Sequence, residues 1–260
     1  MGWLMIEIAL IIALLGLAIA GTWDLFTTEV PDEVPYVMLV AGIFIWYINA
    51  LTFGDFTPLF YSIISGTISL SIGLLMYRQG AWGGADAWLL AATAFLLPIY
   101  NGNIFIFNFV FNLLVVGSAY MIVYSIALGF MNPHVAGIFY KDMKGNMKLI
   151  IPPFLFAFMF AIYEPKFTSV LLIIGALLVF WRYAKVIESH VFRKRIKSSQ
   201  LKPGDVTEDM IWRGLTDNEI REIRKKKKYV IVKEGVRFVP AFPMTLVVTL
   251  LYGNLLIYFI

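Results

Sequence analysis

Eight apolar runs dominate this chain and constrain what it can fold into. A helix that crosses a bilayer needs about 20 consecutive apolar residues. Hydrophobic residues make up 60% of the chain and its mean hydropathy is +0.80, values typical of integral membrane proteins. We therefore predict an all-α, polytopic transmembrane helix bundle with a small cytoplasmic soluble segment. The expected spans lie near residues 4–23, 35–52, 58–77, 86–100, 104–130, 149–163, 167–184 and 238–259.

The number of crossings is six to eight, because two of these runs are short. The fourth and the sixth runs hold fewer residues than a full crossing requires. The sixth also begins with Pro152 and Pro153, and only a few residues separate it from the seventh. Residues 149–184 therefore form either two full spans or a re-entrant hairpin.

The distribution of Lys and Arg predicts the orientation. If the first helix runs from outside to inside, every one of the 21 Lys and Arg residues except Lys166 falls on the cytoplasmic side. Cytoplasmic loops of membrane proteins carry such an excess of basic residues. The same count holds for six or for eight crossings, since a hairpin crosses twice. We expect a multi-pass protein of the cell membrane.

One long polar segment divides the chain. We expect a transmembrane bundle at residues 1–184, a cytoplasmic polar segment at 185–236 and a last transmembrane helix at 237–260. Within the polar segment the pattern predicts helix near 182–198 and 207–228, with a capping box formed by Thr216 and Glu219, and a short strand at 229–232. The basic run 224–228 indicates either attraction to anionic membrane lipids or, as we prefer, a solvated helix end. No nucleic-acid-binding motif accompanies it, and the oligomeric state is left open.

Two aspartates lie at the ends of apolar runs and are the candidate catalytic residues. Asp24 ends the first run, which arrives at the cytoplasmic side, and Asp86 opens the fourth, which departs from that side. A carboxylate at membrane depth is costly and therefore suggests a function. Two carboxyls in one site can act as an aspartyl protease does, one activating water and the other holding a proton. Each aspartate alone is also explained as an ordinary helix-end residue.

The residue inventory argues against metal and cofactor chemistry. The chain has no Cys, which excludes disulfides, thiolate zinc sites and a thiol nucleophile. His134 and His190 lie far apart in sequence and lack the spacing of metal ligands. We expect neither a metal nor a cofactor.

Three sequence strings resemble a known family. They are DLFTTEVPD at residues 24–32, GAWGGADAWLL at 80–90 and VKEGVRFVPAF at 232–242. They are similar to the type IV prepilin peptidases, membrane aspartyl proteases of the Gly-x-Gly-Asp type, and more closely to the archaeal preflagellin (archaellin) peptidases. The resemblance implies an endopeptidase that removes the leader peptide from archaellin or type IV pilin-like precursors, with Asp24 and Asp86 as its catalytic pair.

The second string departs from the family pattern at two positions. Gly83 matches the first glycine of the motif and Gly84 follows it, but Ala85 stands where the family has its second glycine. Trp88 stands where the family often has Lys. Bacterial members also carry a Cys-rich zinc segment and methylate the new N-terminus, so a chain without Cys is expected only to cleave.

The first cytoplasmic loop is purely acidic. The loop contains Glu29, Asp32 and Glu33 and no Lys or Arg. These residues could attract the basic leader of a precursor, or they could form an ordinary solvated loop.

The main alternative function is a proton-coupled membrane transporter that uses Asp24 and Asp86. A structural membrane subunit is a third.

Two further sets of residues are expected to hold helices together. Asn108 and Asn112 lie four residues apart on one helix face and can hydrogen-bond to a neighbouring helix. Glycines 66, 73 and 117 are expected to mark places where helices pack closely.

Overall fold

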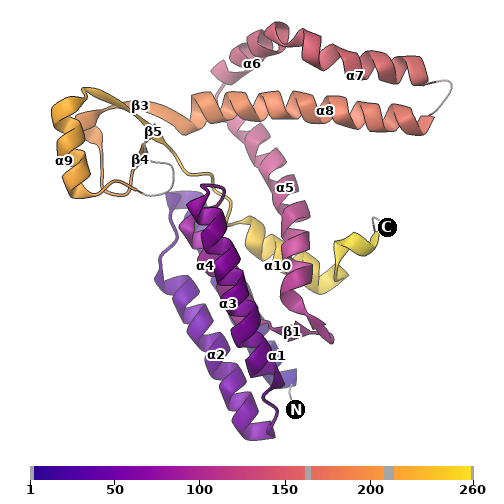
Figure 1. Cartoon of the computed structure of the whole chain (residues 1–260), viewed down its shortest axis with the longest axis vertical. Helices are drawn as coiled ribbons and strands as arrows, with labels where there is room; N and C mark the ends of the chain where they lie inside the picture. Colours follow the sequence, from indigo (N-terminus) through magenta and orange to yellow (C-terminus); the bar gives the residue numbers. More distant parts are fainter. Residues whose placement is uncertain (1–2, 162–164, 208–213, 259–260) are drawn as a thin grey trace. The chain divides into compact units, whose positions relative to one another are not determined.

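The computed structural model describes residues 3–161, 165–207 and 214–258, and helices make up most of this part of the chain (Figure 1). Three short strands form a small sheet and two more form a hairpin. The α-helices are α1 (Trp3–Thr27), α2 (Glu33–Phe53), α3 (Thr57–Arg78), α4 (Gly84–Leu96), α5 (Phe105–Met131), α6 (His134–Gly145), α7 (Met147–Phe160), α8 (Pro165–Ile187), α9 (Asp217–Lys226) and α10 (Ala241–Tyr252).

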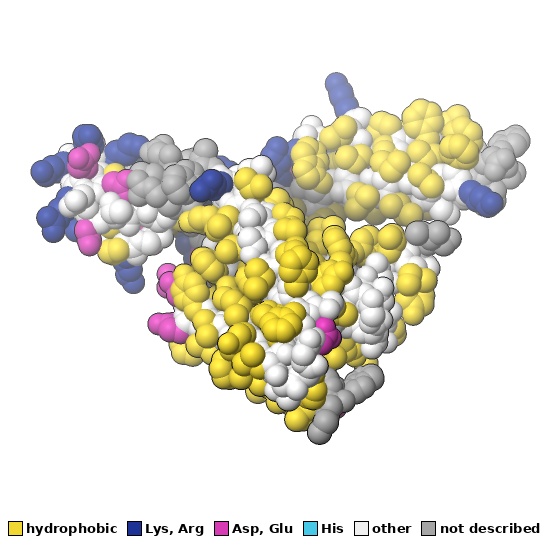
Figure 2. All heavy atoms as spheres, turned by 60° about the horizontal axis from the view of Figure 1, so that its bottom comes forward, with side chains coloured by type: hydrophobic (Ala, Val, Ile, Leu, Met, Phe, Trp, Pro, Cys, Tyr) yellow, Lys and Arg dark blue, Asp and Glu magenta, His cyan; other side chains and the backbone are white. Residues whose placement is uncertain are grey.

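The predicted class, an all-α polytopic membrane bundle, is confirmed. Helices α1, α2, α3, α5 and α8 are long and apolar enough to cross a membrane, and α4, α7 and α10 are shorter apolar helices. Many of their large apolar side chains are exposed, Ile11, Val40 and Phe60 among them, as expected for surfaces that lipid covers. Figure 2 shows hydrophobic side chains spread over the helical parts of the molecule.

The described residues divide into two compact units. One takes in the described residues of 1–121 and 235–260, and the other those of 122–208 and 214–234. The first unit contains both candidate aspartates. Its core is built around α4, and the buried residues of α1, α2, α5 and α10 pack against it.

Helix α4 is buried on almost every side and is held at both ends. Its last carbonyls have no partner within the helix, and in a dry interior each needs a hydrogen bond. Ser62 of α3 donates to the carbonyl oxygen of Phe95 at 2.7 Å, and Trp46 of α2 donates its indole N–H to that of Leu96 at 3.0 Å. Ser65 donates to the carbonyl oxygen of Ala94 at 3.2 Å. These bonds hold α4 in one position along its axis, and they therefore also hold Asp86, at the other end of the helix, in one position.

A tight hairpin, and not a longer helix, follows α4. We expected this run to extend to residue 100, but the helix ends at Leu96 and strands β1 (Ile99–Tyr100) and β2 (Asn103–Ile104) follow. Asn101 and Gly102 join them, both with positive φ, as a two-residue hairpin turn requires. Pro98 lies between helix and strand, where the missing N–H ends the helix.

The last helix is shorter than expected. We predicted a continuous span over 238–259, but α10 ends at Tyr252 and a 3₁₀ turn, Leu255–Tyr258, follows. Asn112 of α5 explains the break, because it donates to the carbonyl oxygen of Gly253 and accepts from the backbone N–H of Leu255 at 2.9 Å. The expected ends of the sixth span at 162–163 and of the last at 259 lie outside the described residues.

The two asparagines and three glycines that we expected to hold helices together do contact neighbouring segments. Asn112 also donates to Thr249 of α10 at 2.9 Å, and Asn108 accepts from Asn254 at 3.1 Å. A Cβ on Gly66 would clash with the ring of Phe95, and one on Gly73 would lie 2.7 Å from Cα of Ala87. A Cβ on Gly117 would lie 2.9 Å from the Phe238 ring.

Residues 149–184 form a helical hairpin with unequal arms. Helix α7 has 14 residues, or about 21 Å, which is less than the roughly 30 Å of a bilayer core. It lies along α8, which is long enough to cross (Figure 1). Pro152 and Pro153 lie inside α7 and do not begin it. The preceding amphipathic helix α6 was not among the expected elements, and its Asp142 accepts from Nε of Arg182 at 2.8 Å.

The second unit also holds a small antiparallel sheet, in the order β3-β5-β4. The predicted strand at 229–232 is confirmed as β5 (Tyr229–Lys233), and the Thr216–Glu219 capping box is confirmed at the start of α9. The helix expected near 182–198 is wrong beyond residue 192. There β3 (Arg193–Lys197) pairs with β5, because tertiary pairing overrides the weak local pattern. Strand β4 (Val206–Thr207) pairs with the other edge of β5.

The contact between α2 and α4 generates a stability prediction. A Cβ on Gly42 would lie 2.7 Å from the backbone carbonyl of Phe95, and backbone atoms there have no room to move. We expect Gly42→Ala to lower the free energy of unfolding by about 1–3 kcal/mol through overpacking. Gly137→Ala in α6 is the matched control, since nothing lies within 4 Å of the added Cβ. Thermal unfolding of both purified variants in detergent measures the difference, and equal melting temperatures would contradict it.

Candidate active site

Asp24 lies in the last turn of α1, as expected, and its side chain is buried. Only 4% of the residue is exposed, although its helix neighbours Trp23 and Leu25 are largely exposed. Its Oδ2 accepts a hydrogen bond from the backbone N–H of Val239 at 3.1 Å. A buried carboxylate requires such a donor, because an unpaired one is costly. Asp24 is therefore oriented by the chain segment that leads into α10.

Asp86 lies in the first turn of α4 and is also buried, with 6% exposed. The chain reaches it through a Schellman turn at the end of α3, where Gly80 adopts φ +71° and the N–H of Ala81 bonds to the carbonyl oxygen of Met76 at 3.0 Å. Oδ2 of Asp86 accepts from the N–H of Gly83 at 2.8 Å. Its Oδ1 is buried and has no hydrogen-bond partner among the described residues.

The two carboxyls lie close enough to each other for their charges to interact. Asp24 lies at the C-terminal end of α1, and Asp86 lies at the N-terminal end of α4. When two carboxyls lie close together, the negative charge of one disfavours ionisation of the other. One can then act as a base while the other keeps its proton. Two neighbouring carboxyls are the groups that general acid–base chemistry on a peptide uses.

The glycines that precede Asp86 lie where a larger side chain would crowd the site. A Cβ on Gly83 would lie 3.2 Å from Oδ2 of Asp86, so a side chain there would crowd the carboxylate. Gly84 begins α4, with the ring of Tyr77 in ordinary contact with the place a Cβ would take. Trp88, which stands where the family often has Lys, packs edge-on against Tyr36 of α2 with the ring centroids 4.9 Å apart.

A third element of the site lies in the string 232–242, but nothing in the sequence indicated that this string meets Asp24. Residues 237–239 run beside Asp24, and Arg237 lies close enough for its charge to act on that carboxylate. Tyr120 of α5 donates to the carbonyl oxygen of Arg237 at 2.8 Å and so holds this segment in place. The contact from Val239 to Asp24 joins residues 215 positions apart and uses a backbone N–H, which any residue except proline provides. Pro240 directly precedes the first turn of α10, and proline is common at the start of a helix.

The three acidic residues of the first loop are exposed. Glu29, Asp32 and Glu33 all point away from the core, while Val30 and Val34 between them pack against it. Because the two valines anchor the α1–α2 connection to the core, its exposed acidic side chains form a fixed, negatively charged outer surface. It follows directly after the turn that carries Asp24.

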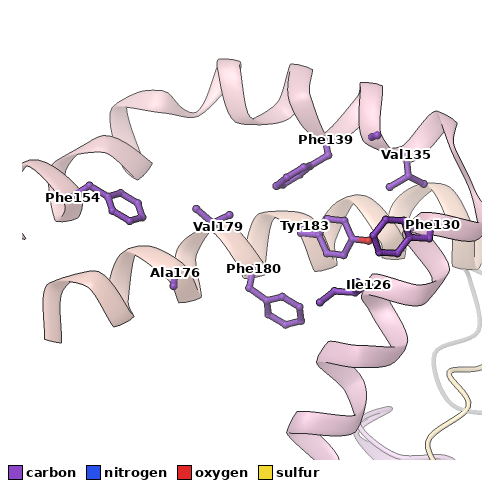
Figure 3. Close-up of a pocket in the computed structure, with 11 residues that line it drawn as sticks. Ile126, Phe130, Val135, Phe139, Phe154, Ala176, Val179, Phe180 and Tyr183 are labelled. Carbon is purple, nitrogen blue, oxygen red and sulfur yellow. The ribbon is translucent and has the colours of Figure 1, made fainter. Parts of the chain in front are cut away.

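Other features of the described residues add no second centre of chemistry. In the second unit, side chains of α5, α6, α7 and α8 line a pocket of about 560 Å³ (Figure 3). Its lining is apolar except for the hydroxyl of Tyr183, which donates to the carbonyl oxygen of Ser125 at 2.9 Å. In the described part of the chain, no group of three His, Cys, Asp or Glu side chains could hold a metal ion.

Comparisons with known proteins identify relatives of the same kind. Residues 11–132 match the type IV leader peptidase family. The chain is 37% identical over 93 residues to a preflagellin peptidase of Methanococcus voltae, covering 36% of this chain and 40% of the relative. It is 30% identical over 106 residues to a preflagellin peptidase of Methanococcus maripaludis, covering 38% of this chain and 46% of the relative. The alignments thus span less than half of the length of these relatives. No solved structure matches the chain.

The matched segment contains α1 from residue 11 onward and α2 to α5, and with them both aspartates and the glycine string between α3 and α4. The resemblance expected from the sequence strings at 24–32 and 80–90 is confirmed, because both strings lie within residues 11–132, which match the type IV leader peptidase family.

Proposed function

We propose that this protein is a membrane-embedded aspartyl endopeptidase that cleaves the leader peptide from archaellin or type IV pilin-like precursors, with Asp24 and Asp86 as its catalytic pair. The observation that carries the proposal is that two buried carboxyls, close enough for their charges to interact, lie within the segment that matches the leader peptidases. The names of the relatives support the substrate class. Nothing in the comparisons favours the transporter alternative.

The proposed reaction needs only water and the two carboxyls. One carboxylate takes a proton from a water molecule, whose oxygen attacks the scissile carbonyl carbon, while the other carboxyl gives its proton to the carbonyl oxygen. The tetrahedral intermediate then collapses. The C–N bond breaks as the nitrogen receives the proton held by the first residue and leaves as the amine. The second residue regains its own proton from a hydroxyl of the intermediate, whose oxygen becomes the new carbonyl oxygen of the acid product. No metal, cofactor or methyl transfer takes part.

The proposed orientation puts the site at the cytoplasmic boundary of the cell membrane. The asymmetry of Lys and Arg supports it. A pilin-like precursor has a long apolar helix preceded by a short basic leader, so its cleavage site lies at the same boundary. The buried positions of Asp24 and Asp86 at helix ends, and not halfway along them, agree with that depth.

The first prediction concerns the two aspartates. We expect Asp24→Asn and Asp86→Asn each to lower kcat by at least about 100-fold, since a positioned acid or base contributes roughly 10²–10⁴ to a rate. Cleavage of an archaellin precursor by purified protein in detergent, followed by gel mobility, measures this. Asp55→Asn is the matched control, because Asp55 is exposed in the loop between α2 and α3. Undiminished cleavage by either site variant would rule out the pair.

The second prediction concerns the acidic loop. We propose that Glu29, Asp32 and Glu33 attract the basic leader, so the combined Glu29→Gln, Asp32→Asn and Glu33→Gln variant should raise KM and leave kcat unchanged. The increase should shrink as salt rises, because exposed charges are screened within about 10 Å at 0.1 M. A KM that matches the wild type at low salt would reject this role.

The third prediction concerns Arg237, which we propose as a positioning residue for Asp24. A charge pair several ångströms apart near a protein surface is worth on the order of 1–4 kcal/mol, so losing part of it corresponds to about a tenfold loss of rate. We expect Arg237→Gln to lower kcat and to shift the pH profile of cleavage, and Arg237→Lys to restore most of both. An unaltered pH profile in Arg237→Gln would show that Arg237 has only a structural role.

A further inference from the structure

The small sheet of the second unit has one open, basic face. In a sheet, residues paired across strands lie on the same side. The pairing of Arg193 with Lys233, of Arg195 with Ile231 and of Lys197 with Tyr229 therefore defines a single surface, which Val206 of β4 extends. We call it the basic sheet face; its members are Arg193, Arg195, Lys197, Val206, Tyr229, Ile231 and Lys233.

The two sides of the sheet are exposed to different degrees. Val230 and Thr207, on the opposite side, are 7% and 2% exposed and belong to the interior of the unit. On the basic sheet face Tyr229 is 42% exposed and Ile231 is 38% exposed. An aromatic and a β-branched side chain of β5 thus lie open beside the row of cations on β3.

The basic sheet face carries positive charge with no acidic member. Arg193 pairs with Glu188, outside the face, at 3.0 Å. The guanidinium of Arg195 lies over the ring of Tyr229, 4.8 Å from its centroid. Across the described residues, no carboxylate forms an ion pair with Arg195, Lys197 or Lys233. Figure 2 shows Lys and Arg side chains spread over the part of the molecule that holds α9 and this sheet.

Chain connectivity ties this sheet closely to a membrane helix. A single π-helical turn, Glu188–Phe192, joins β3 to α8, which is long and apolar enough to cross a bilayer. Five residues cover at most about 18 Å even when fully extended. The sheet therefore stays within a short distance of the surface at which α8 leaves the membrane.

We propose that the basic sheet face binds the surface of an anionic membrane, with its cations against lipid phosphates and Tyr229 and Ile231 at the interface. Basic residues next to a membrane helix are attracted to anionic headgroups, and aromatic side chains with polar tips favour the same depth. The proposal concerns different residues from the basic run 224–228. It is also independent of the proposed protease function.

The absence of Cys allows a direct test on the whole protein. A single Ile231→Cys variant is labelled with an environment-sensitive fluorophore and placed in nanodiscs of phosphatidylcholine, with or without phosphatidylglycerol. We expect a blue shift of the emission and stronger quenching by spin-labelled lipid only in the anionic discs. Asn218→Cys, exposed at the start of α9, is the matched control and should show neither change. No lipid-dependent change at Ile231→Cys, or the same change at Asn218→Cys, would overturn the proposal.

Charge-reversal variants distinguish the effect of the basic sheet face from the effect of the net charge of the unit. In the labelled Ile231→Cys protein, reversing Arg195, Lys197 and Lys233 to Glu should abolish the blue shift. Reversing Lys202, Lys225 and Lys226 to Glu changes the net charge equally and should leave it in place. Equal loss in both sets would mean that overall charge, and not this face, causes the binding. Circular dichroism and the size-exclusion profile of each variant check that the fold is retained.

Discussion

A short helix held at both ends organises the site. Helix α4 has only 13 residues, and its C-terminal carbonyls would be left unpaired in an apolar interior. Side chains of α2 and α3 satisfy them, through Ser62, Ser65 and the indole of Trp46. Small residues let these helices approach, since Gly42 and Gly66 each face Phe95 closely. The result is a rigid support, and the carboxyl at its other end is held in one place.

That support explains how an acidic group can be kept in a buried position without a charged partner in direct contact. Asp86 receives one backbone N–H from Gly83 and leaves Oδ1 unpaired among the described residues, while Asp24 receives one from Val239. Each carboxyl is therefore oriented but not saturated with hydrogen bonds. A group that must bind water and exchange protons requires that spare capacity, at some cost in stability.

The segment before α10 connects the last helix with the first. Tyr120 holds the carbonyl oxygen of Arg237, and the next residues bring a backbone donor and a positive charge to Asp24. Gly21 faces Pro240 at the same level, where a Cβ would lie 3.1 Å from Cα of the proline. Both proposed catalytic groups thus depend on contacts between residues far apart in sequence. Changes in α10 are expected to reach the site through this segment.

The sequence by itself determined the class of the protein, the approximate position of each apolar helix and the two aspartates, because run length and charge distribution are local properties. It also indicated the roles of Asn108 and Asn112 and the capping box at Thr216. Only the tertiary structure decided where helices end and what meets the aspartates. Asn112 breaks the last helix at Gly253, β5 draws residues 193–197 out of a helix, and Val239 reaches Asp24 with a backbone N–H. Such contacts depend on packing between distant segments, which no local pattern encodes.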